Sequence, residues 1–194
     1  MIYKWSPPAI EESNKEQISQ MKEDNIQTGA GSTQLGFGGG CHWCTEAIFD
    51  QLEGVRKVGQ GWIKSDPPYD SYSEAVIVDY DREVISEEVL VQIHLVTHAA
   101  ASNHAMREKY RSAIYFVDQV DEERLNEILQ GLQEKNAQQY ITKVLSLVDF
   151  QSNEKQFLNY YKIRPEAPFC KRHIEPKLRL LMQRFGKKLK ESQD

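Results

Sequence analysis

A cysteine that follows a run of glycines is the residue in this chain best suited to chemistry. Four of the chain's eleven glycines fall between positions 36 and 40, directly before Cys41, where a helical pattern begins. The free N–H groups and the dipole at a helix N-terminus favour negative charge, and so the nucleophilic thiolate of Cys41. Cys44 lies three residues on, at the spacing that puts two side chains on one side of a helix. We therefore expect Cys41 to be a catalytic thiol.

The composition is that of an ordinary globular protein. The 194 residues are 40% hydrophobic and 27% charged, enough for one domain with a sizeable core. The net charge of −5 favours neither nucleic acid nor an anionic membrane as a partner. The sequence contains neither an apolar run of the ~20 residues that span a bilayer nor a recognisable secretory signal. Three cysteines are too few for a disulfide scaffold, so we expect a reducing compartment, most simply the cytoplasm.

The first 33 residues differ from the rest of the chain. They are polar and rich in acidic residues, and they end in a Gly/Ser/Thr stretch at 28–33. Such a composition is typical of an arm that is flexibly joined to a folded body. Residues 34–194 would then form a single catalytic domain that closes with a helix at about 176–190, with Pro176 in its first turn.

The elements that must hold Cys41 follow from the apolar periodicity. Strands are expected at 34–37, 55–63, 74–80 and 110–117, and helices at about 43–53 and after Ser86, a predicted N-cap. This β-α-β-β-α-β order predicts an α/β (α+β) fold: a two-layer ferredoxin-like sandwich with a mixed sheet and packed helices. Beyond it we expect a helix at 121–135 capped by Asp121, a strand at 141–150 and a helix at 153–163.

The segment Gly40-Cys41-His42-Trp43-Cys44-Thr45-Glu46-Ala47 resembles the active-site segment of peptide methionine sulfoxide reductases of the A type, which carries Gly-Cys-Phe-Trp followed by Gly or Cys. Further blocks match in the same order: Gly61-Trp62, Glu74-Ala75-Val76, Tyr80-Asp81, Ile85-Ser86, the stretch 110–115 and the stretch 150–170. The resemblance covers about residues 34–170. It implies a ferredoxin-like α/β fold and thiol-dependent reduction of the S epimer of methionine sulfoxide, free or in proteins, as a repair after oxidation.

The resemblance also implies a role for each matched residue. Cys41 would attack the sulfoxide sulfur, which releases methionine and leaves a sulfenic acid on Cys41. Glu74 matches the family's proton donor, and a pocket would favour its protonated form. Tyr110 matches a tyrosine that hydrogen-bonds the sulfoxide oxygen. Tyr69 is the best match for a second such tyrosine. Tyr72 is an alternative, because the loop before Glu74 is shorter in this chain than in the family.

Besides Tyr72, four residues are expected to bind the substrate: Trp43, Trp62, His42 and His104. Trp43 would supply an apolar wall for the S-methyl group, and Trp62 stands where the family has a tyrosine. His42 replaces the family's phenylalanine: either the imidazole simply packs there, or it alters substrate preference or the pH profile near its unperturbed pKa of ~6.5. The segment 98–109 lacks an aspartate with which the family binds the substrate's amide, and His104 or its neighbour Asn103 could substitute.

Turnover needs a second thiol to condense with the sulfenic acid. Some family members carry a resolving cysteine at the position of Cys44, and many others place theirs where Cys170 stands, in a mobile tail. We expect Cys44 to act first because its i+3 position needs little rearrangement, whereas Cys170 would act next or be structural. The resemblance implies no bound cofactor and thioredoxin as the electron donor.

Other interpretations of these residues are open at this point. Cys41-x-x-Cys44 and Cys170-x-x-His173 together have the form of a Cys3His zinc site, although the halves lie far apart in the sequence and we expect no metal. Cys-x-x-Cys at a helix start is also the motif of general disulfide oxidoreductases. A module that binds oxidised methionine without turning it over is a further alternative.

Overall fold

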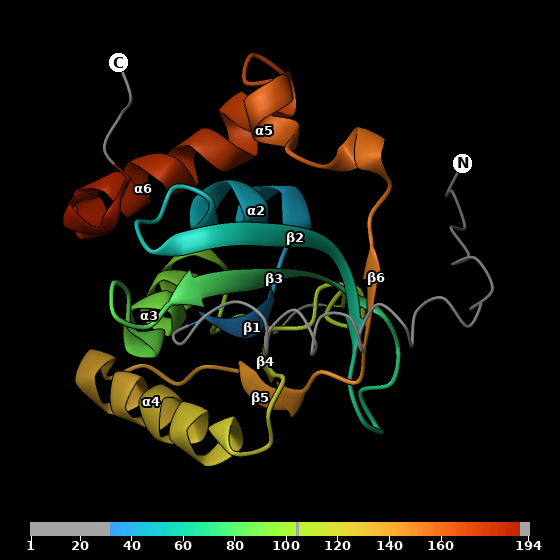
Figure 1. Ribbon diagram of the computed structural model, residues 1–194, viewed down its shortest axis with the longest axis vertical. Coiled ribbons are helices and arrows are strands. Elements are labelled where there is room, and N and C mark those ends of the chain that lie inside the picture. The colour runs from blue at the N-terminus through green and yellow to red at the C-terminus, as the bar shows by residue number, and fades with distance from the viewer. Residues whose placement is uncertain (1–31, 104, 191–194) are drawn as a thin grey trace.

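The computed structural model describes residues 32–103 and 105–190, and Figure 1 shows their arrangement. The expected arm of residues 1–33 lies outside this part of the chain except for its last two residues, and His104 lies outside it too. Within the described residues, no helix combines the length and the apolar character that crossing a bilayer requires.

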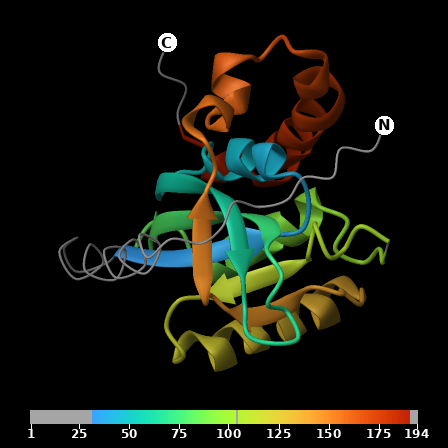
Figure 2. The same cartoon turned by 90° about the vertical axis from the view of Figure 1, so that its right-hand side faces the viewer.

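The described strands form one mixed sheet with the order β5-β4-β1-β3-β2-β6. They are β1 (Ser32–Gly38), β2 (Val55–Lys64), β3 (Ser73–Asp81), β4 (Ala113–Phe116), β5 (Lys143–Ser146) and β6 (Asp149–Ser152). Neighbouring strands are antiparallel except β4 and β5, which are parallel. Figure 2 shows β6 beside β2 at the near edge of the sheet. The central order β4-β1-β3-β2 confirms the predicted ferredoxin-like class.

Two helices make the crossovers between the central strands: α2 (His42–Phe49) and α3 (Glu87–Thr97). α3 begins as predicted, because the Ser86 hydroxyl accepts a hydrogen bond from the Val89 amide. The remaining helices are α4 (Asp121–Asn136), α5 (Tyr160–Ile163), a π-helix (Cys170–Ile174), α6 (Glu175–Phe185) and short 3-10 turns at Lys155–Phe157 and Gly186–Lys188. In Figure 1, α2, α5 and α6 gather at one end of the sheet and α4 lies at the other.

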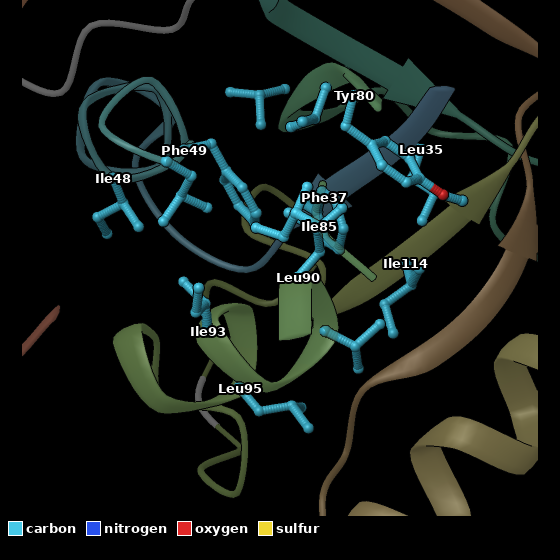
Figure 3. Close-up of a cluster of buried hydrophobic side chains, with 14 of the residues drawn as sticks. Leu35, Phe37, Ile48, Phe49, Tyr80, Ile85, Leu90, Ile93, Leu95 and Ile114 are labelled. Atoms are coloured by element: carbon cyan, nitrogen blue, oxygen red, sulfur yellow. The ribbon is translucent and has the colours of Figure 1, made fainter. Parts of the chain in front are cut away.

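Alternation along the strands separates two hydrophobic clusters. Val76 and Val78 of β3 face the main core with side chains of α2, α3 and α4, whereas Ala75 and Ile77 face a second cluster that includes Phe150. Figure 3 shows the centre of the main core, where apolar side chains of α2 and α3 meet those of the sheet. This packing fixes the position of α2, and with it the position of Cys41.

Two predicted strands differ from those in the structure. The strand expected at 110–117 begins only at Ala113, because the Arg111 amide donates to the Ser73 hydroxyl at 2.8 Å rather than to a neighbouring strand. The strand expected at 141–150 is two strands at opposite edges of the sheet. Leu147 donates its amide hydrogen bond to Phe116 of β4, and Val148 donates to Lys64 of β2, so the chain changes edge between them.

Helix ends were predicted less well. α2 ends at Phe49 rather than 53, because the amides of Gln51 and Leu52 bond the carbonyls three residues back in tight turns. Asp121 is the first residue of α4 and its carboxylate pairs with Arg124, so it is not the cap. The helix expected at 153–163 is broken at Asn159, which has a left-handed backbone (φ 53°). The helix expected at 176–190 is α6, which ends at Phe185.

Candidate active site

The glycine run forms a tight turn between β1 and α2. Gly39 has φ +155°, and a β-carbon there would come within 2.5 Å of the His98 ring. After this turn Cys41 occupies the N-cap of α2, where its carbonyl accepts hydrogen bonds from the amides of Cys44 (3.0 Å) and Thr45 (3.2 Å). The sequence therefore places Cys41 correctly at a helix N-terminus, and glycine is needed at 39 because the backbone approaches His98 so closely.

The buried His94 and the half-buried His98 lie against this turn. The rings of His94 and His98 stack at 4.0 Å, and His98 Nε2 lies 2.8 Å from the Ser112 hydroxyl. Burial lowers the pKa of His98 to about 4 and the pKa of His94 well below its usual value. Both are therefore neutral at pH 7, and their rings pack on each other, as the sequence spacing of four on one helix allows.

This burial predicts a loss of stability in mild acid. The unfolded chain binds a proton at each histidine below a pH of about 6.5, whereas folded His98 does so only near 4. The free energy of unfolding should fall by roughly 3 kcal/mol between these values for His98 alone, and level off below them. Urea unfolding at pH 7.0, 5.5 and 4.5 measures this fall. A His98→Gln variant should show a shallower fall, and an equal slope in both proteins would contradict the assignment.

Glu74 of β3 lies at the same helix start as Cys41. Its side chain is buried (5% exposed), and its Oε2 accepts a hydrogen bond from the His42 amide at 3.2 Å. Its other oxygen, Oε1, lies 3.3 Å from Lys109 Nζ. The His42 amide is one of the N–H groups that a helix N-terminus leaves without a partner, so the carboxylate caps α2. Glu74 and Cys41 consequently face one site.

The ionisation of Cys41 differs from the sequence-based expectation. A hydrogen bond to Cys44, followed by burial and the nearby charge of Glu74, raises the pKa of Cys41. The same hydrogen bond, together with Lys177, lowers the pKa of Cys44. The helix N-terminus alone would favour the thiolate at Cys41, whereas the S–H hydrogen bond from Cys41 to Cys44 favours ionisation of Cys44 over that of Cys41. The two thiols titrate as a pair.

The three tyrosines of the prediction lie in different places. Tyr110 is half-buried; burial and the charge of Glu74 raise its pKa, so its hydroxyl keeps its proton. Tyr72 donates its hydroxyl hydrogen to Asp149. The Tyr69 ring lies between Arg111 and Lys143, each 5.5 Å from its centre. The structure therefore brings Tyr110 close to Glu74 and Cys41, and leaves Tyr69 in a different environment.

A cavity of about 1060 Å³ opens beside Glu74. Residues expected at the site that line it are His42, Trp43, Trp62, Tyr72 and Glu74. Three of the described residues that were predicted to contact the substrate do not line the cavity: Cys41, Tyr110 and Tyr69. Cys41 and Tyr110 are nevertheless the sequence neighbours of residues that do line it, His42 and Lys109. Aromatic side chains and many polar side chains line the cavity together, so it can take a ligand with both an apolar and a polar part.

Trp43 forms part of the wall that faces the C-terminal segment. Its ring stacks on Tyr160 at 4.1 Å and meets Phe169 edge-on at 5.4 Å. Its indole N–H is buried and has no hydrogen-bond partner among the described residues. The prediction missed Lys109 and Tyr160, although Lys109 directly precedes a matched block and was within reach of sequence reasoning.

All three cysteines belong to one apolar cluster. Cys44 and Cys170 are buried in it and Cys41 packs against it. The Cys170 thiol donates to the Arg164 carbonyl at 3.1 Å and is fully buried, and the π-helix and α6 pack on α2. His173 meets Cys44 through its backbone carbonyl, and no three metal-binding side chains gather in the described part of the chain.

Comparison with known proteins agrees with this geometry. A family model described as peptide methionine sulfoxide reductase matches residues 33–189. The chain is 31% identical to the peptide methionine sulfoxide reductase MsrA of Deinococcus radiodurans over 193 residues, which cover 91% of this chain and 94% of that protein. It is 32% identical to MsrA of Pasteurella multocida over 155 residues, covering 73% and 89%.

Solved structures show the same fold. Methionine sulfoxide reductase A of Corynebacterium diphtheriae superposes with a TM-score of 0.58 at 21% identity, covering 73% of this chain and 79% of that one. Reduced Mxr1 from Saccharomyces cerevisiae gives 0.57 at 22% identity, covering 74% and 92%, and Mxr1 in complex with Trx2 gives 0.51 at 18% identity, covering 65% and 84%. Because the family model matches residues 33–189, which are most of the chain, the chain belongs to the peptide methionine sulfoxide reductase family.

Proposed function

We propose that this chain reduces the S epimer of methionine sulfoxide, free or in peptides, with Cys41 as nucleophile and Glu74 as acid. The family supplies the reaction, the thiol-dependent reduction of methionine sulfoxide. The observation that carries the assignment of roles is the hydrogen bond from the His42 amide to Glu74, because it joins the carboxyl group to the helix start that Cys41 caps. Nucleophile and acid can then act on the sulfur and the oxygen of one substrate.

The first step transfers oxygen to Cys41. Its sulfur attacks the sulfoxide sulfur while Cys44, which shares its proton, takes up the proton released. Glu74 gives its own proton to the sulfoxide oxygen, and Tyr110 donates a hydrogen bond to that oxygen. Methionine leaves, and Cys41 becomes a sulfenic acid. Trp43 and Trp62 form the apolar wall against which the S-methyl group would rest.

The second step forms a disulfide. The Cys44 sulfur attacks the Cys41 sulfenic acid, and water leaves as the Cys41–Cys44 bond forms. Cys170 shares their apolar cluster and could exchange with this disulfide next, after local opening. Burial raises the pKa of Cys170, so in the closed fold it is the poorer nucleophile. We therefore assign the first resolution to Cys44.

Thioredoxin is the proposed reductant. A structural neighbour, yeast Mxr1, has been solved in complex with Trx2, and no bound cofactor is needed for thiol–disulfide exchange. We place the protein in a reducing compartment such as the cytoplasm, where three unpaired cysteines would stay reduced. There it would repair oxidised proteins during oxidative stress.

An assay with separated epimers tests the proposal. The purified protein should form methionine from L-methionine S-sulfoxide with either dithiothreitol or reduced thioredoxin, and not from the R epimer. Equal turnover of both epimers would contradict the proposed stereochemistry, and turnover of neither would contradict the reaction itself.

Two tyrosine substitutions should have unequal effects. Tyr110→Phe removes a hydroxyl near Glu74 and should lower kcat/KM by about 10- to 100-fold, as expected for a hydrogen bond to developing charge. Tyr69→Phe should leave kcat/KM close to wild type, because the Tyr69 ring packs with Arg111 and Lys143. Steady-state assays of both variants decide between them. A loss in Tyr69→Phe comparable to that in Tyr110→Phe would support Tyr69 as the second tyrosine at the sulfoxide oxygen.

A further inference from the structure

A series of hydrogen-bonded polar side chains, buried except for the half-buried Asn153, leads to His42. Gln60 of β2 donates from Nε2 to the Glu46 carboxylate at 2.8 Å and to the Phe157 carbonyl at 3.3 Å. Asn153, which follows β6, donates from Nδ2 to Gln60 Oε1 at 2.8 Å. The same Nδ2 lies 3.2 Å from Nε2 of His42. These contacts connect α2 through two sheet strands to the ring of His42.

The chemistry of these groups fixes which atom donates and which accepts in each of these hydrogen bonds. A carboxylate and a backbone carbonyl only accept hydrogen bonds, so Gln60 must present Nε2 to them and Oε1 to Asn153. A backbone amide only donates, and Glu154 N–H meets Asn153 Oδ1 at 3.0 Å, which fixes the Asn153 amide independently. Asn153 therefore donates to His42 Nε2. A neutral imidazole has one proton, which must then be on Nδ1.

That proton faces Glu74. His42 is 5% exposed, and burial lowers its pKa, so the ring is neutral at pH 7. Its Nδ1 lies 3.5 Å from Glu74 Oε2 and makes no hydrogen bond within the described residues, so Glu74 is an acceptor close to hand. The ring meets Trp62 edge-on at 5.5 Å, and an interaction with the Gly61 backbone carbonyl opposes the effect of burial on its pKa. A phenylalanine here, as in the family motif, would offer Glu74 no donor.

We propose that His42 is a positioning residue for Glu74: Asn153 sets its tautomer, and its Nδ1–H holds Oε2 so that Oε1 faces the substrate. The inference rests on the proposed role of Glu74 as the acid. Among the described residues, the charged and titratable groups that interact with Glu74 are Cys41, His42 and Cys44 from the start of α2, and Lys109 and Tyr110 from the segment before β4. When Glu74 gives up its proton, the 3.5 Å separation can shorten to a hydrogen bond with the new carboxylate.

The inference predicts a shift in the pH–rate profile. A donor to the ionised carboxylate favours that form, so its removal should move the alkaline fall in kcat/KM upward by about one pH unit. His42→Phe removes the donor, and Asn153→Leu removes the group that keeps the proton on Nδ1. Asn126→Leu on α4 is the matched control, because exposed Asn126 bonds only the Glu122 carbonyl among the contacts described. It should leave the profile unchanged.

The tautomer itself can be measured without any variant or substrate. Long-range 1H–15N NMR of the reduced protein at pH 7, with the His42 signals assigned by their loss in His42→Phe, should show the proton on Nδ1. A proton on Nε2 overturns the proposal, as do equal profiles for Asn153→Leu and Asn126→Leu. The NMR result stands apart from activity: a protein that reduces no sulfoxide fails the proposed function, whereas one that does so with the proton on Nε2 fails only this inference.

Discussion

Cys41→Ser is expected to abolish methionine formation, with a loss of at least about a thousandfold in kcat. A serine hydroxyl at the same position cannot act as the soft nucleophile that attack on sulfur requires, and it cannot carry the oxygen as a sulfenic acid. The effect should be the same with dithiothreitol and with thioredoxin, because the loss precedes any step that uses the reductant. Chromatography of the methionine product measures it.

The other cysteines provide the controls for this result. With dithiothreitol as reductant, Cys170→Ser should retain turnover, because a small dithiol can resolve the Cys41 sulfenic acid directly. Cys44→Ser should also turn over, but more slowly, because it lacks the thiol that takes up the Cys41 proton. With thioredoxin, Cys44→Ser should lose most of its activity. Continued turnover by Cys41→Ser would falsify the assignment of the nucleophile.

Glu74→Gln should lower kcat by roughly 10²- to 10⁴-fold, the usual range for loss of a general acid. The glutamine oxygen can still accept the hydrogen bond from the His42 amide, so the start of α2 should remain intact. The amide has no proton to give to the sulfoxide oxygen. The alkaline fall in activity that accompanies ionisation of the acid should therefore disappear from the residual rate.

A matched substitution shows whether the effect is local. Glu88→Gln changes an exposed glutamate in the first turn of α3 and should leave kcat unchanged. Full activity in Glu74→Gln would show that another group, with Lys109 the nearest candidate, supplies the proton.

The sequence predicts those elements of the fold that are set by interactions between residues close together in the chain. The central βαββαβ unit follows from periodicity, and Ser86 caps α3 because its hydroxyl reaches an amide three residues on. The segment 141–150 could not be divided in the same way. Its apolar residues suit one long strand, and only the partners Phe116 and Lys64, distant in the sequence, separate it into β5 and β6.

At the site, too, features set by the local sequence were predictable and features set by distant residues were not. Cys41 was placed by its glycine run and Glu74 by its motif, but the ionisation of Cys41 depends on the sulfur of Cys44 and on Glu74, a residue from another element. Spacing alone did not distinguish Tyr69 from Tyr72, since their difference arises from Arg111 and Asp149, on distant segments. Cys170 matched a tail position in sequence, whereas its burial depends on how α6 packs against α2.

A single turnover without reductant tests the central chemistry most directly. Fully reduced protein, mixed with an excess of L-methionine S-sulfoxide, should form about one equivalent of methionine in a first fast phase, and peptide mapping at that point should find a Cys41–Cys44 disulfide. A second equivalent, if formed, should appear only with a disulfide that includes Cys170. Methionine formed while Cys41 remains a free thiol would contradict the account.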